Sequence, residues 1–181
     1  THWIMNVDTT EVTTADEWLL IDGAIATCAG GGLVGEGQLV PVAAGGDGVE
    51  AWSAVFGSLG INEAGDHCYE ADTTGATGAD GVIVYNGQIR WRESSVLDGL
   101  TLSGAPNGLC LNEDGDVAHT WNIVGGTEAI FLNDELVVQE GDTVDWNGDG
   151  VLDAGIVLTE ITATTGLVAG PRGAGGAVAV Y

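Results

Sequence analysis

The sequence predicts an all-β protein, organised as a β-propeller-like array of about three four-stranded antiparallel meanders with incomplete terminal blades. Three observations support this fold class. The 181 residues include 31 glycines and only three prolines, a composition that favours frequent tight turns. No window carries a sustained helical period of apolar residues. Short apolar runs instead alternate with turn residues and recur along the chain.

The recurrence has a period of 50 residues. Ile61–Asp66 and Leu111–Asp116 are near copies of each other at this spacing. Such a period indicates one supersecondary unit that is used more than once. A strand is expected directly after each copy, at His67–Ala71 and at Val117–Trp121.

A hairpin is expected next in each unit. Its turns are Asn86-Gly87 and Asn133-Asp134, residues that tolerate the positive φ of a two-residue hairpin loop. The arms are Val82–Tyr85 with Gln88–Glu93, and Ala129–Leu132 with Glu135–Glu140. A strand ahead of each asparagine, at Trp52–Ile61 and Asn107–Leu111, completes a four-stranded meander, which is the make-up of a propeller blade.

A weaker copy opens the chain. Met5-Asn6 is matched to Ile61-Asn62, and Trp18–Ile25 repeats the hairpin with Asp22-Gly23 as its turn. We therefore predict a single β-repeat domain over 1–181. Its parts are repeats at about 1–28, 51–100 and 101–150, an insertion at 29–50 that could form an extra hairpin around Gly35–Gly37, and terminal strands within 156–181.

The two ends of this array are incomplete and complementary. Gly166–Ala169 and Ala177–Tyr181 resemble the first one or two strands of another repeat, whereas the amino end lacks the first strand of a blade. Joined within one molecule, the ends would close a small ring. Joined between molecules, they would give a fibre or a larger ring by strand addition. Three repeats are fewer than propellers usually contain, so self-association is expected; a piece of a longer repeat protein would show the same ends.

A candidate calcium loop follows the last complete unit, at 145–153. Oxygen ligands stand at alternate positions around Gly150, which supplies the tight turn. Ile156 occupies the position of the bidentate glutamate of an EF-hand, and Leu136–Val138 and Ile156–Leu158 look like flanking strands. Asp, Asn and Gly also form ordinary solvated turns, but the alternate spacing favours a metal. The proposed Ca²⁺ ligands are the side chains of Asp145, Asn147, Asp149 and Asp153 and the backbone carbonyl of Val151.

Two resemblances extend this interpretation. The loop resembles the Asp-x-Asp-x-Asp-Gly-x-x-Asp loop of FG-GAP repeats in integrin-type β-propellers, with Asn147 in place of the middle Asp. Leu111–Ala118 and Glu140–Asp142, and more loosely Ile61–Asp66, resemble exported bacterial proteins built from Leu-Asn-Asp-x-Gly-x-Val-Ala-Phe units. Here Glu replaces the usual Asp, and His119 stands where an aromatic residue is expected. The second resemblance implies an extracellular, β-propeller-like module with no established catalytic activity.

Charge limits the classes of partner. The chain has 27 acidic residues, three arginines and no lysine, for a formal charge of −24. Nucleic acids and anionic membranes are therefore not expected as partners, and the apolar runs are too short for membrane insertion. Self-repulsion on this scale favours stabilisation by cations. The hydrophobic content of 45% and six tryptophans predict a folded rather than a disordered chain.

The amino end and the cysteines concern the compartment. The sequence starts at Thr1 rather than at Met, so we expect an exported protein, extracellular or at the cell surface; a sequence cut from a longer one would start in the same way. Cys28, Cys68 and Cys110 form an odd set without metal-ligand spacing. One disulfide with one buried thiol and three buried thiols both fit this set.

No catalytic constellation stands out, and we expect that the chain is not an enzyme. Its only imidazoles, His2, His67 and His119, have neither metal-ligand spacing nor a nucleophile elbow beside them. Several acids recur in each repeat, which favours turn or cap roles over a unique active site. These recurring pairs are Glu63 with Glu113 and Glu93 with Glu140.

The expected function is therefore a secreted, calcium-stabilised structural or adhesive module, a subunit of an extracellular fibre or surface assembly. Two alternatives remain. One is a polysaccharide-active enzyme with paired carboxylates in a cleft. The other is a carbohydrate-binding module that uses Trp91, Trp146, Arg90 and Arg92. The simpler interpretation buries Trp91 and pairs both arginines with carboxylates, and Trp146 is expected to pack on the next strand unless it contacts a partner or sugar.

Overall fold

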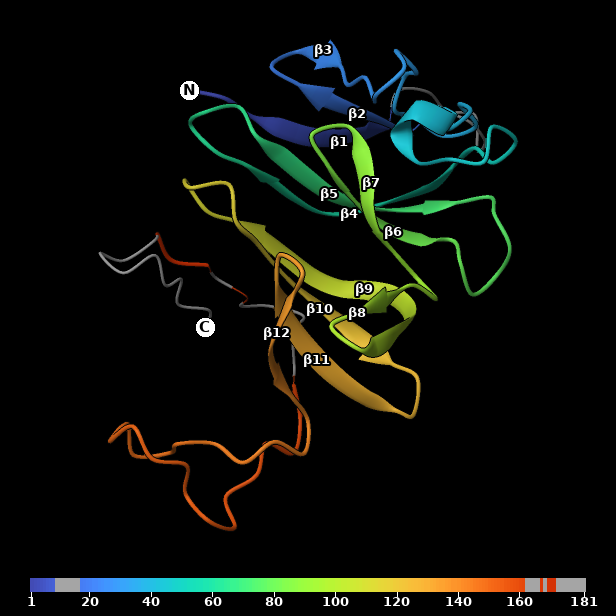
Figure 1. Cartoon of the computed structure of the whole chain (residues 1–181). Helices are drawn as coiled ribbons and strands as arrows, with labels where there is room; N and C mark the ends of the chain where they lie inside the picture. The colour runs from blue at the N-terminus through green and yellow to red at the C-terminus, as the bar shows by residue number, and fades with distance from the viewer. Residues whose placement is uncertain (9–16, 162–166, 168, 172–181) are drawn as a thin grey trace.

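Three antiparallel sheets make up the computed structural model of the chain, which describes residues 1–8, 17–161, 167 and 169–171 (Figure 1). The first sheet, in the order β1–β2–β3, contains Ile4–Asp8, Glu17–Ile21 and Ala24–Ile25. The second, β4–β5–β6–β7, contains Trp52–Ile61, His67–Thr73, Gly81–Tyr85 and Gln88–Arg92. The third runs β8–β9–β10–β11–β12, with bounds Val96–Leu97, Leu100–Leu111, Val117–Ile123, Thr127–Leu132 and Glu135–Gln139.

The predicted all-β fold class is thereby confirmed for the described residues, whose only helical element is the short 3-10 turn η1 (Val42–Ala44). The predicted hairpin turns are confirmed as well. Asp22, Asn86 and Asn133 have φ values of 51°, 48° and 54°, the left-handed region that asparagine and aspartate tolerate best among residues with a side chain. The strand predicted at Trp52–Ile61 has the bounds observed for β4.

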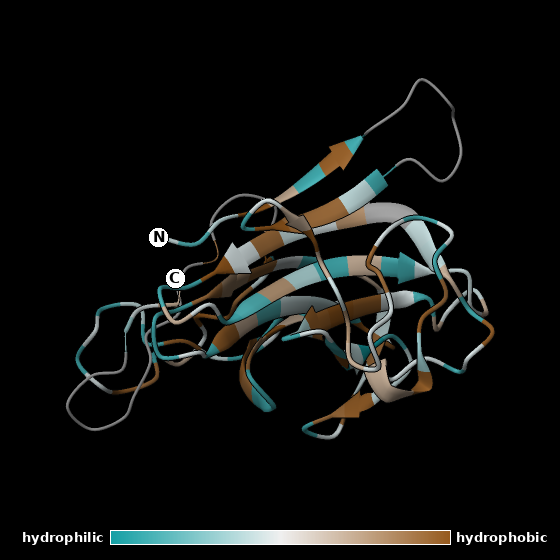
Figure 2. Cartoon of the chain, turned by 90° about the horizontal axis from the view of Figure 1, so that it is seen from above, coloured by the Kyte–Doolittle hydropathy of each residue, from teal (hydrophilic) through white to brown (hydrophobic). Residues whose placement is uncertain are grey.

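The second sheet buries both of its faces. Alternate side chains of a strand point to opposite sides. Tyr69 and Ala71 of β5 therefore pack into one hydrophobic core, and Cys68, which precedes Tyr69, packs into a second core on the other face. Val82 and Val84 of β6 likewise face the first core. Because both faces are covered, β6 is apolar almost throughout instead of alternating with polar residues. Figure 2 shows the stacked strands from above, coloured by hydropathy.

Two hydrophobic cores therefore separate the three sheets. The first core lies between the first and second sheets and is centred on Trp52, Phe56 and Tyr69, whose ring centroids are 6.3–6.4 Å apart. The second lies between the second and third sheets and contains Trp121 and Phe131, both fully buried. The sheets follow one another in Figure 1 from β1–β3 at the top to β8–β12 below.

Hydrogen bonds among two asparagines and one aspartate join the strand ends of the second and third sheets. We call this network of side chains the asparagine–aspartate bracket. In the second sheet, Asn62 Oδ1 accepts the N–H groups of Ala64 and Asp66, at 3.0 and 2.9 Å. The Asp66 carboxylate then accepts the side-chain amides of Asn62 and Asn86, at 3.2 and 2.8 Å. Asn86 Oδ1 in turn accepts the N–H of His67 at 2.9 Å. The bracket thus fastens the β4–β5 turn to the β6–β7 turn.

The third sheet repeats the same bracket 50 residues later. Asn112 Oδ1 accepts the N–H groups of Asp114 and Asp116, and Asp116 accepts the side-chain amides of Asn112 and Asn133, all at 2.7–3.1 Å. The two brackets are also joined, because the side-chain amide of Asn62 donates to the backbone carbonyl of Asn112 at 3.2 Å. Both asparagines therefore hold a turn of their own sheet, and Asn62 also bonds to the next sheet.

The register predicted for the first repeat is wrong. Trp3 N–H donates to Asp22 Oδ1 and Trp3 carbonyl accepts the Asp22 N–H, as His67 does with Asn86. Trp3 is therefore equivalent to His67, and β1 takes the place in its sheet that β5 takes in the second sheet. Met5-Asn6 thus lies within a strand and does not match Ile61-Asn62. The prediction aligned Asn6 with Asn62 because the residues are identical. The alternation of side chains between the two faces of β1 does not distinguish the two alignments, since they differ by an even number of residues.

Two further expectations differ from the structure. The insertion does not form its own hairpin at Gly35–Gly37: Gly35 bridges Trp18, and beyond the turn the chain pairs with Trp52. The segments before and after this turn each pair with a neighbouring strand, so they do not pair with each other. The first strand of the third unit is also longer than the predicted Asn107–Leu111, because it begins at Leu100 in a hairpin with β8.

The predicted terminal strands fall mostly outside the described residues. Ala177–Tyr181 and Val168 lie outside them, whereas Ala169 and Gly170 lie within them. Gly170 is tied to the third sheet, because its carbonyl accepts the side-chain amide of Asn112 at 2.8 Å. All three cysteines are free thiols, so the one-disulfide alternative is excluded, and burial raises the pKa of each thiol.

His119 is fully buried and packs against the second core. Its Nδ1 accepts the Trp121 indole N–H at 3.0 Å, and its Nε2 lies 2.9 Å from the Asn133 carbonyl, a pairing in which the neutral ring donates from Nε2. The ring also stacks on Phe131 with centroids 5.6 Å apart. Burial is the main cause that lowers the pKa of His119 to about 4.

This burial predicts acid sensitivity. Above the ordinary histidine pKa of about 6.5, both folded and unfolded chains hold a neutral ring; as the pH falls from there toward 4, only the unfolded chain gains the proton, and stability is lost. Between pH 7 and pH 5 the loss from His119 should be about 2 kcal/mol. We expect urea unfolding to show this loss in the wild type, and H119Q, which keeps an acceptor for Trp121, to lack it. Equal losses in both proteins would contradict this assignment.

Candidate functional site

The predicted calcium loop projects from the third sheet on a short ladder of its own, visible as the orange loop at the lower left of Figure 1. Thr143 and Val157 form an isolated bridge, and Val144 N–H donates to the Ile156 carbonyl at 3.1 Å. The predicted strand at Ile156–Leu158 is thus reduced to this bridge, whereas Leu136–Val138 lies in β12 as predicted. The paired base holds the two ends of 145–153 together.

Asp145 organises the loop. Its Oδ1 accepts the N–H groups of Gly148 and Asp149, at 2.7 and 3.3 Å, and its Oδ2 accepts that of Gly150 at 2.7 Å. The Gly150 N–H is the main cause that lowers the pKa of Asp145, since hydrogen bonds to a carboxylate favour its ionised form. Gly148 and Gly150 have φ values of 74° and 86°, which let the backbone curl around this side chain.

The other predicted ligands follow the same pattern. Asn147 Oδ1 accepts the N–H of Asp149, and Asp149 Oδ1 accepts the N–H of Val151, both at 2.9 Å. Asp153 spans the loop, because its Oδ2 accepts the Trp146 N–H at 2.9 Å. All five predicted ligand residues therefore lie in one curled loop whose side-chain oxygens are held by backbone N–H groups.

The donor chemistry of the loop fits calcium. Three carboxylates, one amide oxygen and one backbone carbonyl are hard oxygen donors of the kind that Ca²⁺ binds. Within the described part of the chain, no three His, Cys, Asp or Glu side chains are already grouped closely enough to hold a metal ion. The structure thus provides the curl and the donors, while convergence of Asp145, Asp149 and Asp153 on a cation remains an expectation.

Trp146 is exposed, against the expectation that it packs on the next strand. Its exposed fraction is 81%, and those of Val151 and Leu152 are 67% and 64%. The loop projects too far from the sheets for these side chains to reach a core. An indole in this position is available to a partner, which was the other interpretation of this residue.

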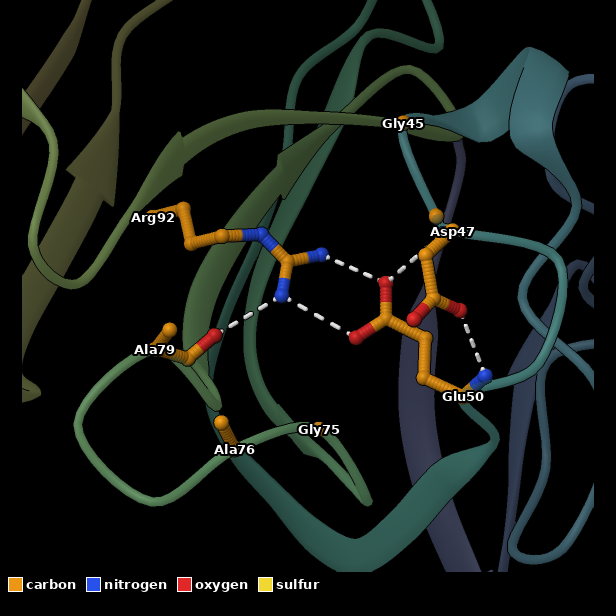
Figure 3. Close-up of a pocket in the computed structure, with 8 residues that line it drawn as sticks. Gly45, Asp47, Glu50, Gly75, Ala76, Ala79 and Arg92 are labelled. Atoms are coloured by element: carbon orange, nitrogen blue, oxygen red, sulfur yellow. Dashed lines mark hydrogen bonds and ion pairs between the residues drawn. The ribbon is translucent and has the colours of Figure 1, made fainter.

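A second polar site lies beside the insertion, where Arg92 meets Glu50 (Figure 3). The guanidinium donates to both carboxylate oxygens, at 2.8 and 3.0 Å, and to the Ala79 carbonyl at 2.8 Å. Thr73 Oγ1 also donates to Glu50, at 2.8 Å. The Glu50 side chain is only 4% exposed. This bidentate pair lines a pocket of about 330 Å³ together with Asp47 and small residues of the facing loops.

Arg90 forms an ion pair with the third sheet, on the other side of the second sheet from Glu50. It donates to Asp134 at 2.8 Å, and the Trp91 indole N–H donates to the same carboxylate at 2.9 Å. Trp91 is only 3% exposed. The prediction that Trp91 is buried and that both arginines pair with carboxylates is confirmed, so Trp91 offers no platform for a sugar. Sequence alone did not identify Glu50, because nothing in its local pattern signals a partner 42 residues away.

Three of the four recurring acids accept backbone N–H groups. Glu113 Oε2 accepts the Glu63 N–H at 2.9 Å, and Glu93 Oε1 accepts the Gly104 N–H at 2.6 Å. Glu140 accepts the N–H groups of Glu128 and Ile161, at 3.1 and 3.0 Å. These bonds connect neighbouring turns and strands, so the predicted turn or cap role is confirmed for Glu93, Glu113 and Glu140.

Comparison with protein-family models, with characterised proteins and with solved structures found no significant match. Among the residues that the structure describes, none belongs to a helix with the length and apolar character needed to traverse a bilayer.

The two arginine pairs predict different costs of mutation. R92M leaves the buried Glu50 carboxylate without its cation and should destabilise the fold by about 3 kcal/mol, because an unpaired buried charge is costly. R90M removes a pair that is exposed on both sides and should cost less than about 1 kcal/mol. Urea unfolding of both variants checks this order. A loss for R90M as large as that for R92M would contradict it.

Proposed function

We propose that this chain is a secreted structural or adhesive module that calcium stabilises and that serves as a subunit of an extracellular assembly. The observation that carries the proposal is the curled loop at 145–153, in which the ionised Asp145 gathers three backbone N–H groups. These bonds curl the loop so that all five proposed ligand residues lie within it. Asp145, Asn147, Asp149, Val151 and Asp153 would hold the ion.

Charge supports the same proposal. The net charge of −24 opposes compaction, and the two described arginines are already engaged by Glu50 and Asp134. A divalent cation would neutralise part of the remaining charge in the loop that carries three aspartates. Extracellular location fits this need, because calcium modules of that compartment function with weak sites.

A propeller-like arrangement of the sheets is part of the proposal. The second sheet is a four-stranded meander, the third contains the same meander with β8 added, and each unit presents its first strand to the preceding sheet. Bonded brackets between consecutive units extend this order. Self-association through the chain ends would then continue the array beyond one molecule.

A second candidate function is carbohydrate binding through Trp146. Its 81% exposure favours this alternative, because an exposed indole beside a cation site can stack on a sugar ring. The caps found for the recurring glutamates favour non-catalytic roles over a polysaccharide-active enzyme.

Calcium should raise the melting temperature. Because a ligand that binds only the folded state stabilises it, we expect the midpoint in millimolar Ca²⁺ to exceed that in EDTA by about 5 °C. In D145N the difference should disappear. D142N is the matched control: Asp142 lies just outside the loop and accepts one N–H, from Gln139, which an asparagine oxygen can also accept.

Calorimetry of the wild type, D145N and D142N, each in calcium and in EDTA, tests whether the loop binds calcium. An equal midpoint in calcium and EDTA for the wild type would contradict the calcium proposal, as would a shift that D145N retains in full. Isothermal titration of the wild type with CaCl₂ should also show saturable binding that D145N lacks.

A further inference from the structure

The Arg92 guanidinium has hydrogen-bond donors that no described residue uses. A guanidinium carries five N–H groups in one plane. Nη1 donates to Glu50 and to the Ala79 carbonyl, and Nη2 donates once, to Glu50. The N–H of Nε and the second N–H of Nη2 have no acceptor among the described residues. These two groups lie parallel on one side of the guanidinium, so they form a donor fork that can hold a pair of acceptor oxygens.

This donor fork opens into the pocket of about 330 Å³ beside the insertion, which Arg92 lines. Nε is not one of the buried polar atoms that lack a partner in the described part of the chain, so it is open to solvent. Figure 3 shows the guanidinium between the loop at 45–50 and the loop at 75–79. The volume is at the lower end of the range of about 300–1,000 Å³ for ligand pockets, so a ligand here is small.

Glu50 holds the donor fork in place. Its carboxylate accepts two N–H groups of Arg92, the hydroxyl of Thr73 and the backbone N–H of Asp47, at 2.8–3.1 Å. These bonds use the acceptor sites of a carboxylate, so Glu50 has none left for a ligand. The carboxylate instead keeps the guanidinium in one orientation, and a donor that is fixed in advance loses less entropy when a ligand binds.

Asp47 lines the same pocket and supplies an acceptor. Its Oδ1 accepts the N–H groups of Val49 and Glu50, both at 2.7 Å, and no described residue donates to its Oδ2. The Glu50 N–H is the main cause that lowers the pKa of Asp47, and the charge of Arg92 adds to it. Asp47 is thus ionised at neutral pH and presents a carboxylate oxygen in the pocket that contains the donor fork.

Small residues leave the space between the two loops open. Besides three charged side chains, the pocket is lined by three glycines and two alanines. A Cβ at Gly75 would lie 3.0 Å from Glu50 Oε2, and one at Gly46 would lie 2.4 Å from the Val40 carbonyl. Glycine therefore lets both loops approach the ion pair closely without a side chain that would fill the pocket.

The charges of these groups select a neutral ligand with hydroxyls. The ligand has to accept from the donor fork and donate to Asp47, and a hydroxyl does both. A free carboxylate or phosphate would fill the donor fork but would face Asp47, Glu50 and a net charge of −24, all of which repel it. Adjacent hydroxyls on one sugar ring meet both requirements without adding charge.

We propose that this pocket binds a single neutral sugar ring, in which two adjacent hydroxyl oxygens accept from Arg92 Nε and Nη2 and one hydroxyl donates to Asp47 Oδ2. The inference goes beyond the proposed assembly role and does not depend on calcium. It also differs from carbohydrate binding through Trp146, because that residue lies on the projecting loop at 145–153, whereas this pocket lies between the insertion and the second sheet.

Titration followed by NMR tests the pocket. Methyl glycosides of glucose, galactose and mannose are added in turn to the isotope-labelled wild type. We expect at least one of them to shift the backbone amides of Gly46 and Gly75 and the Nε–H resonance of Arg92 saturably. The Kd should be about 1 mM, because a small ligand with few contacts binds weakly. Absence of such shifts with all three sugars would overturn the proposal.

Two substitutions test the roles of the charged side chains. R92K keeps a cation beside Glu50 but lacks the planar pair of donors, so the sugar should bind at least about tenfold more weakly. R90K is the matched control on the same strand, because Arg90 pairs with Asp134 outside the pocket, and it should bind as the wild type does. D47N keeps Oδ1 but loses the charged acceptor, and the same weakening is expected. Dispersed amide spectra check that the variants are folded.

The remaining outcomes distinguish this pocket from other sites and ligands. Sugar binding that R92K retains in full overturns the pocket. Shifts confined to 145–153 and lost in W146A also overturn it, because they assign the sugar to the projecting loop. Shifts of the pocket amides by free alanine, and by none of the sugars, overturn the ligand class. Sugar binding in the pocket with equal melting in calcium and EDTA supports this inference and contradicts only the calcium proposal.

Discussion

The asparagine–aspartate bracket is the interaction on which the stack depends. Asn62 and Asn112 are 3% and 5% exposed, and each uses its amide to fasten a turn of its own sheet and to donate to the next unit. A buried amide has several groups to satisfy, and leaving one unpaired is costly. The bracket therefore fixes both the turn and the relative position of neighbouring sheets. Hydrophobic contacts alone are not directional and would let the sheets slide over each other.

The negative net charge is the second constraint on the fold, and it explains the positions of the arginine side chains. An acidic chain with three arginines places two of them on β7, where Arg92 binds Glu50 beside the insertion and Arg90 binds Asp134 of the third sheet. Both pairs join segments that would otherwise repel. The loop at 145–153 has no such partner among the described arginines, and for this reason a bound cation would matter most there.

Local sequence predicted the strands and turns well because turn residues and apolar alternation act over a few positions. The hairpin turns at Asn86 and Asn133 and the strand from Trp52 to Ile61 are examples. Contacts between distant segments were not predictable in this way. Pairing of Arg92 with Glu50 depends on the path of the insertion, and the register of β1 was misread because an asparagine in a strand was matched to one in a turn. For the loop, spacing identified the residues, and the structure added the backbone bonds that curl it.

Amide hydrogen exchange followed by NMR tests the central role of the bracket most directly. The N–H groups of Asp66 and Asp116 donate to Asn62 and Asn112 Oδ1, at 2.9 and 2.7 Å. If the brackets hold the stack together, these two turn amides should exchange as slowly as the core amide of Ile83, through global unfolding. Exchange of either amide at the rate of an exposed turn such as Gly125 would contradict the account.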